Sequence, residues 1–335
     1  MPGSQGVGAD TNSGTASEGR LYSFAGVHRL IVLLALLTVL LLIAGALVTS
    51  NDAGDSVPDW PMSFGRWIVG NRHFVGNVRY EYSHRVVAGT VTLVTFAVAV
   101  WAWSSRRLRQ QLQWLALATF GGVVLQAALG GVRVLLLGYK VPIAIIHAFV
   151  AQSFFCLVVC LWTVTSRSWH AAGTAGTVRT GQAATATLRT LTALTVATVL
   201  VQLVLGAGFR HGAWGIEWHI AGAVAVTLMT VWTAVSVVRR HKADRYLLTP
   251  ALVMCGLLVC QIGLGIAAYV ARLRSVDDPQ PLEPMVSLTV AHVVVGALTL
   301  ASVLVLALRC HQVLAPRVVV ATPVPPKSAY SSQLG

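Results

Sequence analysis

Residues 82–93 read YSHRVVAGTVTL, and residues 217–228 read EWHIAGAVAVTL, so the second stretch repeats the first at an offset of 135. Two further pairs repeat in the same order: LQAALGG (125–131) with CQIGLGI (260–266), and IIHAFVA (145–151) with VAHVVVG (290–296). Self-similarity of this kind indicates a duplicated structural unit. We therefore expect two equivalent halves, residues 28–166 and 188–310.

The composition excludes a soluble protein. Of 335 residues, 56% are apolar and only 10% are charged, and the mean hydropathy is +0.72. Soluble domains carry about 25% charged residues, so this chain lacks the polar surface needed to face water on all sides. Five cysteines offer no disulfide framework, because four lie inside apolar runs and Cys310 lies at the end of another.

Eight apolar runs are long enough to cross about 30 Å of hydrocarbon. They are residues 30–49, 86–103, 114–137, 142–165, 190–209, 216–238, 247–270 and 286–308. The expected fold class is an all-α integral membrane protein with eight transmembrane helices, arranged as two parallel-repeat four-helix bundles.

Polar, low-complexity segments flank these halves. Residues 1–27 and 311–335 are expected to be disordered cytoplasmic tails, and 167–187 a cytoplasmic linker. No basic region precedes the first apolar run, so we interpret that run as a retained helix and not as a cleaved signal peptide.

The net charge of +13 follows from topology and does not indicate a nucleic-acid partner. With both termini in the cytoplasm, 15 basic and 3 acidic residues face inward, and the remaining 9 basic and 8 acidic residues face outward. The positive-inside rule favours this orientation. It predicts a multi-pass membrane protein with cytoplasmic termini, in contact with anionic lipid. The Ala-, Val- and Arg-rich composition indicates a bacterium, and hence the bacterial plasma membrane.

Four histidines recur near the start of the even-numbered spans, so all four are expected at similar depth near the outer face. They are His84, His147, His219 and His292, two in each half. Ionisable residues inside a membrane are scarce and usually functional. The alternative is that each imidazole only hydrogen-bonds a neighbouring helix. The other six histidines lie at span ends or in loops, where solvated side chains are expected.

Two facing histidines in a four-helix bundle can act as axial ligands of haem iron. Zinc is the rival metal, but a closed zinc site needs about four nitrogen or sulfur ligands. Each half offers two histidines without a cysteine or a clear carboxylate partner. The pattern therefore favours one bis-histidine haem site in each half.

The repeat is asymmetric at an acidic position. Glu81 precedes His84 by one helical turn, whereas its counterpart is Ile216, and Glu217 lies only two residues before His219. Either Glu81 is a helix N-terminal carboxylate favoured by the dipole, or it is the acid–base group of a reaction site in the first half.

Two more features distinguish the first half. Arg85 is replaced by Ile220 in the second half, and it either pairs with a haem propionate or extends to the surface. In addition, 39 residues separate Gly45 from His84, whereas 13 separate the matching Gly206 from His219. The insertion predicts a long outer loop that covers the first site.

These residues resemble the heme A synthase family over roughly residues 25–310. The motifs that carry the resemblance are EYSHR (81–85), DWP (59–61), QAALGG (126–131), the histidine of IIHAF (145–149), and the WH and AH pairs at 218–219 and 291–292. The resemblance implies oxidation of the C8 methyl group of heme O to a formyl group, through the alcohol and a gem-diol, with water as the oxygen source.

The resemblance also implies a role for each site residue. His84 and His147 would bind the substrate haem, with Arg85 added from the comparison of the two halves, and His219 and His292 would ligate a heme b cofactor. Glu81 would be required for activity. Many members carry a cysteine pair in the first outer loop, but residues 50–80 contain no cysteine, so this chain is similar to the Cys-lacking type.

The implied partners are heme O, heme O synthase, terminal oxidase assembly and an electron acceptor that the sequence does not name. A second copy of the chain is left open, and nucleic acid is not expected. Two rival functions are a bis-histidine diheme electron carrier without haem-modifying activity and a transporter built from parallel repeats. An electron carrier needs neither Glu81 nor the long loop, and no interrupted spans support a transporter.

Overall fold

A computed structural model describes residues 12–68, 70, 73–174, 182–274 and 282–314. These residues form helices, together with one isolated β-bridge between Ser63 and Arg66. Eight of the helices are long and apolar enough to span a membrane. The predicted all-α, eight-span fold class is confirmed.

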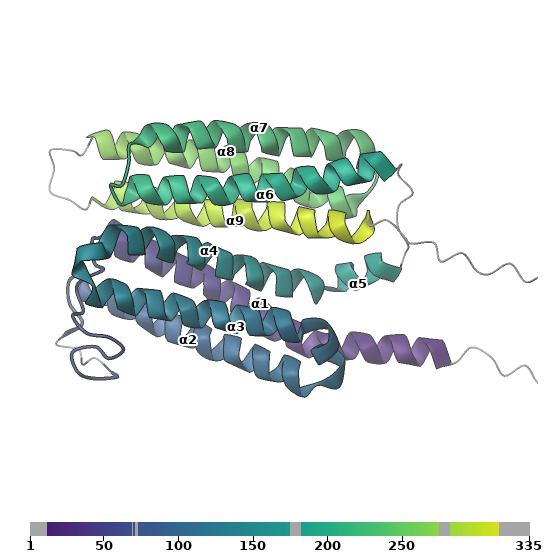
Figure 1. The fold of residues 1–335 in the computed structure, drawn as a ribbon, viewed down its shortest axis with the longest axis horizontal. Coiled ribbons are helices and arrows are strands. Elements are labelled where there is room, and N and C mark those ends of the chain that lie inside the picture. Colours follow the sequence, from purple (N-terminus) through teal and green to yellow (C-terminus); the bar gives the residue numbers. More distant parts are fainter. Residues whose placement is uncertain (1–11, 69, 71–72, 175–181, 275–281, 315–335) are drawn as a thin grey trace, which may run out of the picture.

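The first half is a closed ring of four long helices, in which each packs against the next and the fourth returns to the first (Figure 1). The short helix η2 (Leu137–Tyr139) leads into the fourth. The ring consists of α1 (Asn12–Ser50), α2 (Val78–Ser104), α3 (Arg106–Leu135) and α4 (Lys140–Val164). In such a ring α2 and α4 face each other diagonally.

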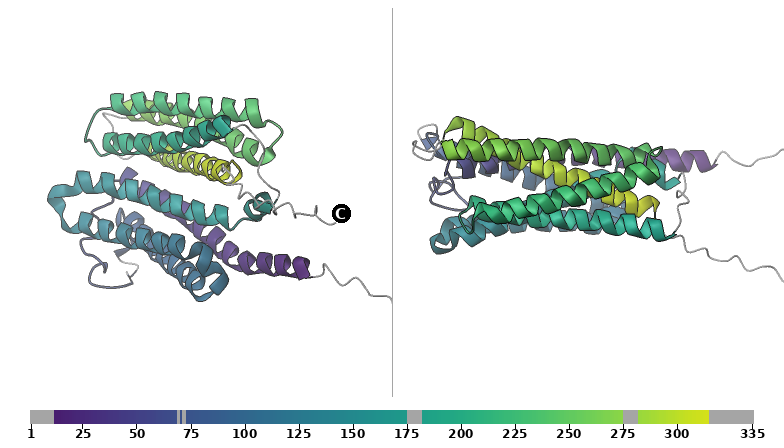
Figure 2. Two further views of the ribbon diagram at one scale, coloured as in Figure 1. Left: turned by 45° about the vertical axis from the view of Figure 1, so that its right-hand side comes forward. Right: turned by 90° about the horizontal axis from the view of Figure 1, so that it is seen from above.

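The second half repeats this arrangement, and α5 (Arg167–Thr174) lies between the two halves in sequence. The helices that correspond to α1–α4 are α6 (Gln182–Arg210), α7 (Ile216–His241), α8 (Arg245–Arg274) and α9 (Glu283–Val313). Here α7 and α9 are the diagonal pair. The two rings lie side by side with their helices nearly parallel (Figure 2).

The halves meet through equivalent helices. α9 packs against α1 and α4, and α6 packs against α4. Phe155 and Val159 of α4 form a buried apolar cluster with Ala297 and Val305 of α9. Because α1 corresponds to α6 and α4 to α9, these contacts fit two parallel repeats related by an axis along the helices.

Several boundaries differ from the sequence-based ones. α1 begins at Asn12, inside the predicted tail 1–27, and α9 ends at Val313, just inside the predicted tail 311–335. The predicted linker 167–187 contains α5, and α6 begins at Gln182 within it. Residues 1–11, 175–181 and 315–335 lie outside the described residues. The start of α1 and the end of α9 lie at one end of the molecule (Figure 1).

The connection from α1 to α2, residues 51–77, forms the predicted long loop at the opposite end (Figure 1). Lys140 Nζ lies 2.7 Å from Asp55 Oδ2 and ties the loop to the start of α4. The Trp60 ring packs over Gly131 of α3, where a Cβ atom would collide with it. This long loop therefore packs onto the first half.

Asp59 organises a tight turn in this loop. Its two carboxylate oxygens accept hydrogen bonds from the backbone N–H groups of Phe64 and Gly65, each at 2.7 Å. Burial acts to raise the pKa of Asp59, but these amide hydrogen bonds and the nearby Arg85 outweigh it and lower the pKa below its ordinary value of 3.8.

We predict that Asp59→Ala loosens the turn. Because the folded-state pKa is below the unfolded one, the stabilisation by Asp59 is complete above the ordinary value and is lost as pH falls through the lowered one. Hydrogen exchange at Phe64 and Gly65 should accelerate by roughly three- to tenfold at neutral pH. Unchanged exchange at both amides would contradict this account of the turn.

Candidate functional site

The four predicted histidines occupy equivalent places in the two rings. His84 lies on α2, His147 on α4, His219 on α7 and His292 on α9, each in the first ten residues of its helix. These are the diagonal helices of their rings, and all four begin at the end of the molecule that carries the long loop (Figure 1). Each half therefore holds one pair of histidines at matched depth.

Each imidazole rests against a glycine of a neighbouring helix. We describe each contact by the distance from the imidazole Cε1 atom to a Cβ atom placed on the glycine. The pairs are Gly45 with His84 at 3.2 Å, Gly130 with His147 at 3.5 Å, Gly206 with His219 at 2.9 Å, and Gly265 with His292 at 2.9 Å. The closest two leave no room for a side chain, so glycine is required there.

The second pair is close together. The ring centroids of His219 and His292 lie 6.1 Å apart, with the ring planes at 75°. Two imidazoles on one metal, with metal–nitrogen bonds of about 2 Å, have centroids about 6 Å apart. The Phe209 ring lies nearly parallel to His219, with centroids 6.5 Å apart. The separation of the second pair fits two imidazoles that would hold one metal ion between them.

Glutamines orient the rings of the second pair. His292 Nδ1 lies 3.1 Å from the backbone carbonyl oxygen of Gln261, which can only accept, so Nδ1 carries the proton and Nε2 accepts a hydrogen bond from Gln261 Nε2 at 3.2 Å. The bond from Nδ1 to a backbone carbonyl is the arrangement typical of a metal-binding histidine, and the Gln261 amide occupies the position at Nε2 that a metal would take. Gln202 Nε2 contacts both the ring and the backbone carbonyl of His219.

In the first pair, the ring nitrogens Nδ1 of His84 and His147 are both buried, and neither has a hydrogen-bond partner among the described residues. Gln126, the repeat partner of Gln261, donates to the backbone carbonyl of His147 instead of the ring. The two rings are near enough to interact electrostatically. Buried polar atoms are normally paired, so this site is built to receive a further group.

The donor set fits haem iron better than zinc. Within the described ranges, no group of three or more histidine, cysteine or acidic side chains could share a metal ion. All five cysteines are free and lie in α4, α8 and α9. Two facing imidazoles can complete the axial coordination of a porphyrin-bound iron, whereas a closed zinc site lacks two ligands.

Glu81 is buried one turn before His84, with 5% of its surface exposed. Its Oε1 accepts a hydrogen bond from Arg85 Nη2 at 2.7 Å, and its Oε2 accepts one from the backbone N–H of Val57 at 2.9 Å. In the second half, Ile216 takes this place and Glu217 is exposed. The predicted asymmetry between the halves therefore involves a buried, ion-paired carboxylate.

Arg85 has partners that the sequence did not indicate. Its Nη1 donates to the carbonyl oxygens of Asp59 at 2.7 Å and Met62 at 3.0 Å, and its Nη2 contacts the carbonyl of Val57 at 3.3 Å. The guanidinium thus fastens the long loop to α2 and to Glu81. The alternative of an extended surface position is wrong, because the Arg85 side chain is only 18% exposed, and the pairing with a propionate stays a prediction.

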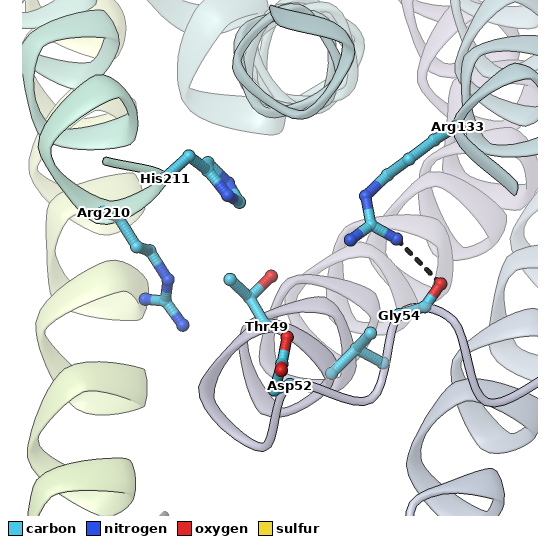
Figure 3. Close-up of a pocket in the computed structure, with 7 residues that line it drawn as sticks. Thr49, Asp52, Gly54, Arg133, Arg210 and His211 are labelled. Carbon is cyan, nitrogen blue, oxygen red and sulfur yellow. Dashed lines mark hydrogen bonds between the residues drawn. The ribbon is translucent and has the colours of Figure 1, made fainter. Parts of the chain in front are cut away.

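Sequence reasoning missed a cavity at the same end of the molecule. It lies between the C-terminal ends of α1, α3 and α6 and is lined by Val48, Thr49, Asp52, Gly54, Arg133, Arg210 and His211 (Figure 3). His211 was expected to be a solvated loop residue, but it is half-buried here. No repeated motif marks these residues, and so the pattern of the sequence could not reveal them.

A duplicated integral membrane protein with two paired-histidine sites, one of them beside a buried carboxylate, is the class that this fold and site define. The chain belongs to the COX15-CtaA family of cytochrome oxidase assembly proteins, whose signature matches residues 28–217. The predicted resemblance is thereby confirmed. The match ends before His219, so the second site is supported by the internal repeat and by its geometry.

Three relatives named heme A synthase illustrate the similarity. The protein of Shouchella clausii is 31% identical over 135 residues, which are 40% of this chain and 44% of the relative. The protein of Geobacillus kaustophilus is 34% identical over 102 residues, 30% of this chain and 31% of the relative. The protein of Symbiobacterium thermophilum is 39% identical over 92 residues, 27% and 29% of the two chains. Each match spans less than half of the relative.

The glycine contacts give a direct prediction. Gly206→Val should displace His219 and lower the haem content of the second half by about tenfold or more, because the added side chain occupies the place of the imidazole. Gly256→Val, also within a span but with open space around it, is the matched control. Haem absorbance per protein is the measurement, and equal haem in both variants would contradict the prediction.

Proposed function

We propose that this protein is a heme A synthase, which oxidises the C8 methyl group of heme O to a formyl group. Family membership and the printed name of several relatives support this proposal. Because those matches span less than half of each relative, the activity, substrate and partners of the whole protein belong to the proposal.

The observation that carries the proposal is the asymmetry between two otherwise equivalent sites. Both halves have paired histidines against glycines, but only the first has the buried carboxylate Glu81 and the long loop fastened over it. A protein that only passes electrons between two haems needs neither feature. We therefore assign substrate binding to His84 and His147, and the cofactor site to His219 and His292.

The conversion of a methyl group to a formyl group with water as the oxygen source releases four electrons and four protons. Glu81 is suited to accept and release a proton, since it is a carboxylate within one turn of a ligand to the substrate. Arg85 balances its charge at 2.7 Å. Arg85 would act on the substrate through Glu81 and the loop, as a positioning residue.

When bound in the second half, heme b would supply one-electron redox chemistry, so that electrons could leave toward an acceptor. Gln261 would orient the His292 ring for this purpose, and Gln202 would hold His219. The proposal places the protein in a bacterial plasma membrane with cytoplasmic termini, next to heme O synthase and in the assembly of terminal oxidases. The proposed partners also include anionic lipid and a second copy of the chain.

The test is the replacement of Glu81 by glutamine. Glu81→Gln keeps the size of the side chain and one of its two acceptor oxygens but removes its charge and its acid–base function, so we expect a loss of heme A formation of at least a hundredfold. The protein is expressed with a source of heme O, and its bound haems are separated by chromatography. Heme O and heme b should remain bound.

Glu217→Gln is the matched control, because it removes the exposed carboxylate at the start of α7. It should leave heme A formation unchanged. Normal heme A from Glu81→Gln would return Glu81 to a structural role. If the unmodified protein carries only heme b and never forms heme A, the electron carrier is the correct reading.

A further inference from the structure

The cavity of Figure 3 has a volume of about 230 Å³ and lies between the two halves of the molecule. Val48 and Thr49 come from the end of α1, Arg133 from the end of α3, and Arg210 from the end of α6. The side chains of Arg133, Arg210 and His211 converge on it (Figure 3). The cavity thus gathers positively charged groups from both halves.

Arg210 is only partly used by the protein. Its Nη2 donates to the carbonyl of Ala46 at 3.1 Å and to Ser50 Oγ at 2.6 Å, at the end of α1. Its Nη1 is buried and has no hydrogen-bond partner in the part of the chain that the structure describes. Leaving a buried charged donor unpaired is costly, which indicates that a ligand completes this group.

Arg133 makes a similar contribution from the first half. Its Nη1 donates to the carbonyl of Gly54 at 2.8 Å and lies 3.9 Å from Asp55. Asp55 has a closer partner in Lys140, at 2.7 Å. The Arg133 guanidinium is therefore held in place by the loop and not neutralised by it.

The charges that face the cavity favour the binding of anionic groups. Burial, together with Arg210 and Arg133, lowers the pKa of His211 to about 4, so this imidazole is neutral at physiological pH and can still donate one hydrogen bond. Asp52 is the acidic lining residue, and it is exposed. Two arginines against one solvent-exposed carboxylate leave a net positive cavity.

The cavity is close to one histidine of each pair. Arg133 follows Gly130, against which His147 rests, by about one turn of α3, and Arg210 follows Gly206, against which His219 rests, by about one turn of α6. An anion bound here would lie between the two haem sites. A haem carries two propionate carboxylates, and arginine binds carboxylates in a bidentate manner.

We propose that this cavity is a carboxylate site for haem propionates, in which Arg210 holds a propionate of the haem in the second half and Arg133 one of the haem in the first. The inference rests on the proposed function, because it takes haem as the ligand of the paired histidines. It replaces Arg85 as the expected propionate partner. In this arrangement the haems of both halves would reach the same cavity.

The experiment compares heme b with its dimethyl ester, which has the same iron and ring but no carboxylate charge. Both are titrated into the full-length protein in detergent after removal of its haem, and binding is followed by haem absorbance. The unmodified protein should bind the ester roughly ten- to hundredfold more weakly. Arg210→Gln should weaken heme b binding by a similar factor and leave ester binding unchanged, while Arg210→Lys should retain part of the difference.

Arg79→Gln is the matched control, since Arg79 is an exposed arginine at the start of α2 that does not line the cavity. It should bind both ligands as the unmodified protein does. Equal affinity of the unmodified protein for heme b and its ester would overturn the inference and would point to a free anion. The inference would also be overturned if Arg210→Gln weakened the binding of heme b and of its ester equally, because Arg210 would then only stabilise the end of α1.

Failure of the haem assignment looks different, because the unmodified protein would then bind neither heme b nor the ester through its histidines, and no low-spin haem spectrum would form. Failure of the heme A synthase proposal alone would leave haem binding intact and show as the absence of heme A. If both ligands bind through the histidines with equal affinity, the propionate site is overturned and the haem assignment stands. The first measurement needs no variant, so a folding defect of Arg210→Gln does not weaken the test.

Discussion

The close approach of each imidazole to a backbone glycine is the constraint on which the rest of this structure depends. A histidine in the core of a helical bundle fills the space that a ligand would occupy, unless the neighbouring helix has a small residue at the point of contact. Glycine on that helix provides the space, since a Cβ atom would lie within 2.9–3.5 Å of the ring in all four cases. The Cε1 edge of the ring is thereby held against one helix, and the helices of each half remain close enough to pack. Because the glycine–imidazole contact recurs at the duplicated positions, the two halves hold sites of the same construction.

The two sites then differ in what surrounds them. In the second half, glutamines engage both rings, and a short connection leads from α6 to α7. In the first half, Nδ1 of each ring has no hydrogen-bond partner among the described residues, and an inserted loop is fastened by Arg85 to a buried Glu81. A site whose ligands are fixed within the protein suits a resident electron carrier. A site with unpartnered imidazole nitrogens, a buried carboxylate and a loop packed over it suits a substrate that must enter, react and leave.

Much of this could be predicted from the sequence, because the relevant signals are periodic. The length of the apolar runs predicts the spans, and the spacing of the repeat predicts that His84, His147, His219 and His292 form pairs. The partners of Arg85 could not be predicted, since they are carbonyl oxygens of a loop whose path depends on tertiary packing. Arg133, Arg210 and His211 were missed for the same reason: they come from different helices, share no motif and meet only after the halves pack together.

The central claim is that each half binds one haem iron between two histidines. Electron paramagnetic resonance of the full-length protein, purified with its haems and combined with metal analysis, tests it most directly. The account predicts about two iron atoms per chain, both in the low-spin state produced by two imidazole ligands. Stoichiometric zinc, or iron only in a high-spin state with a single histidine ligand, would contradict it.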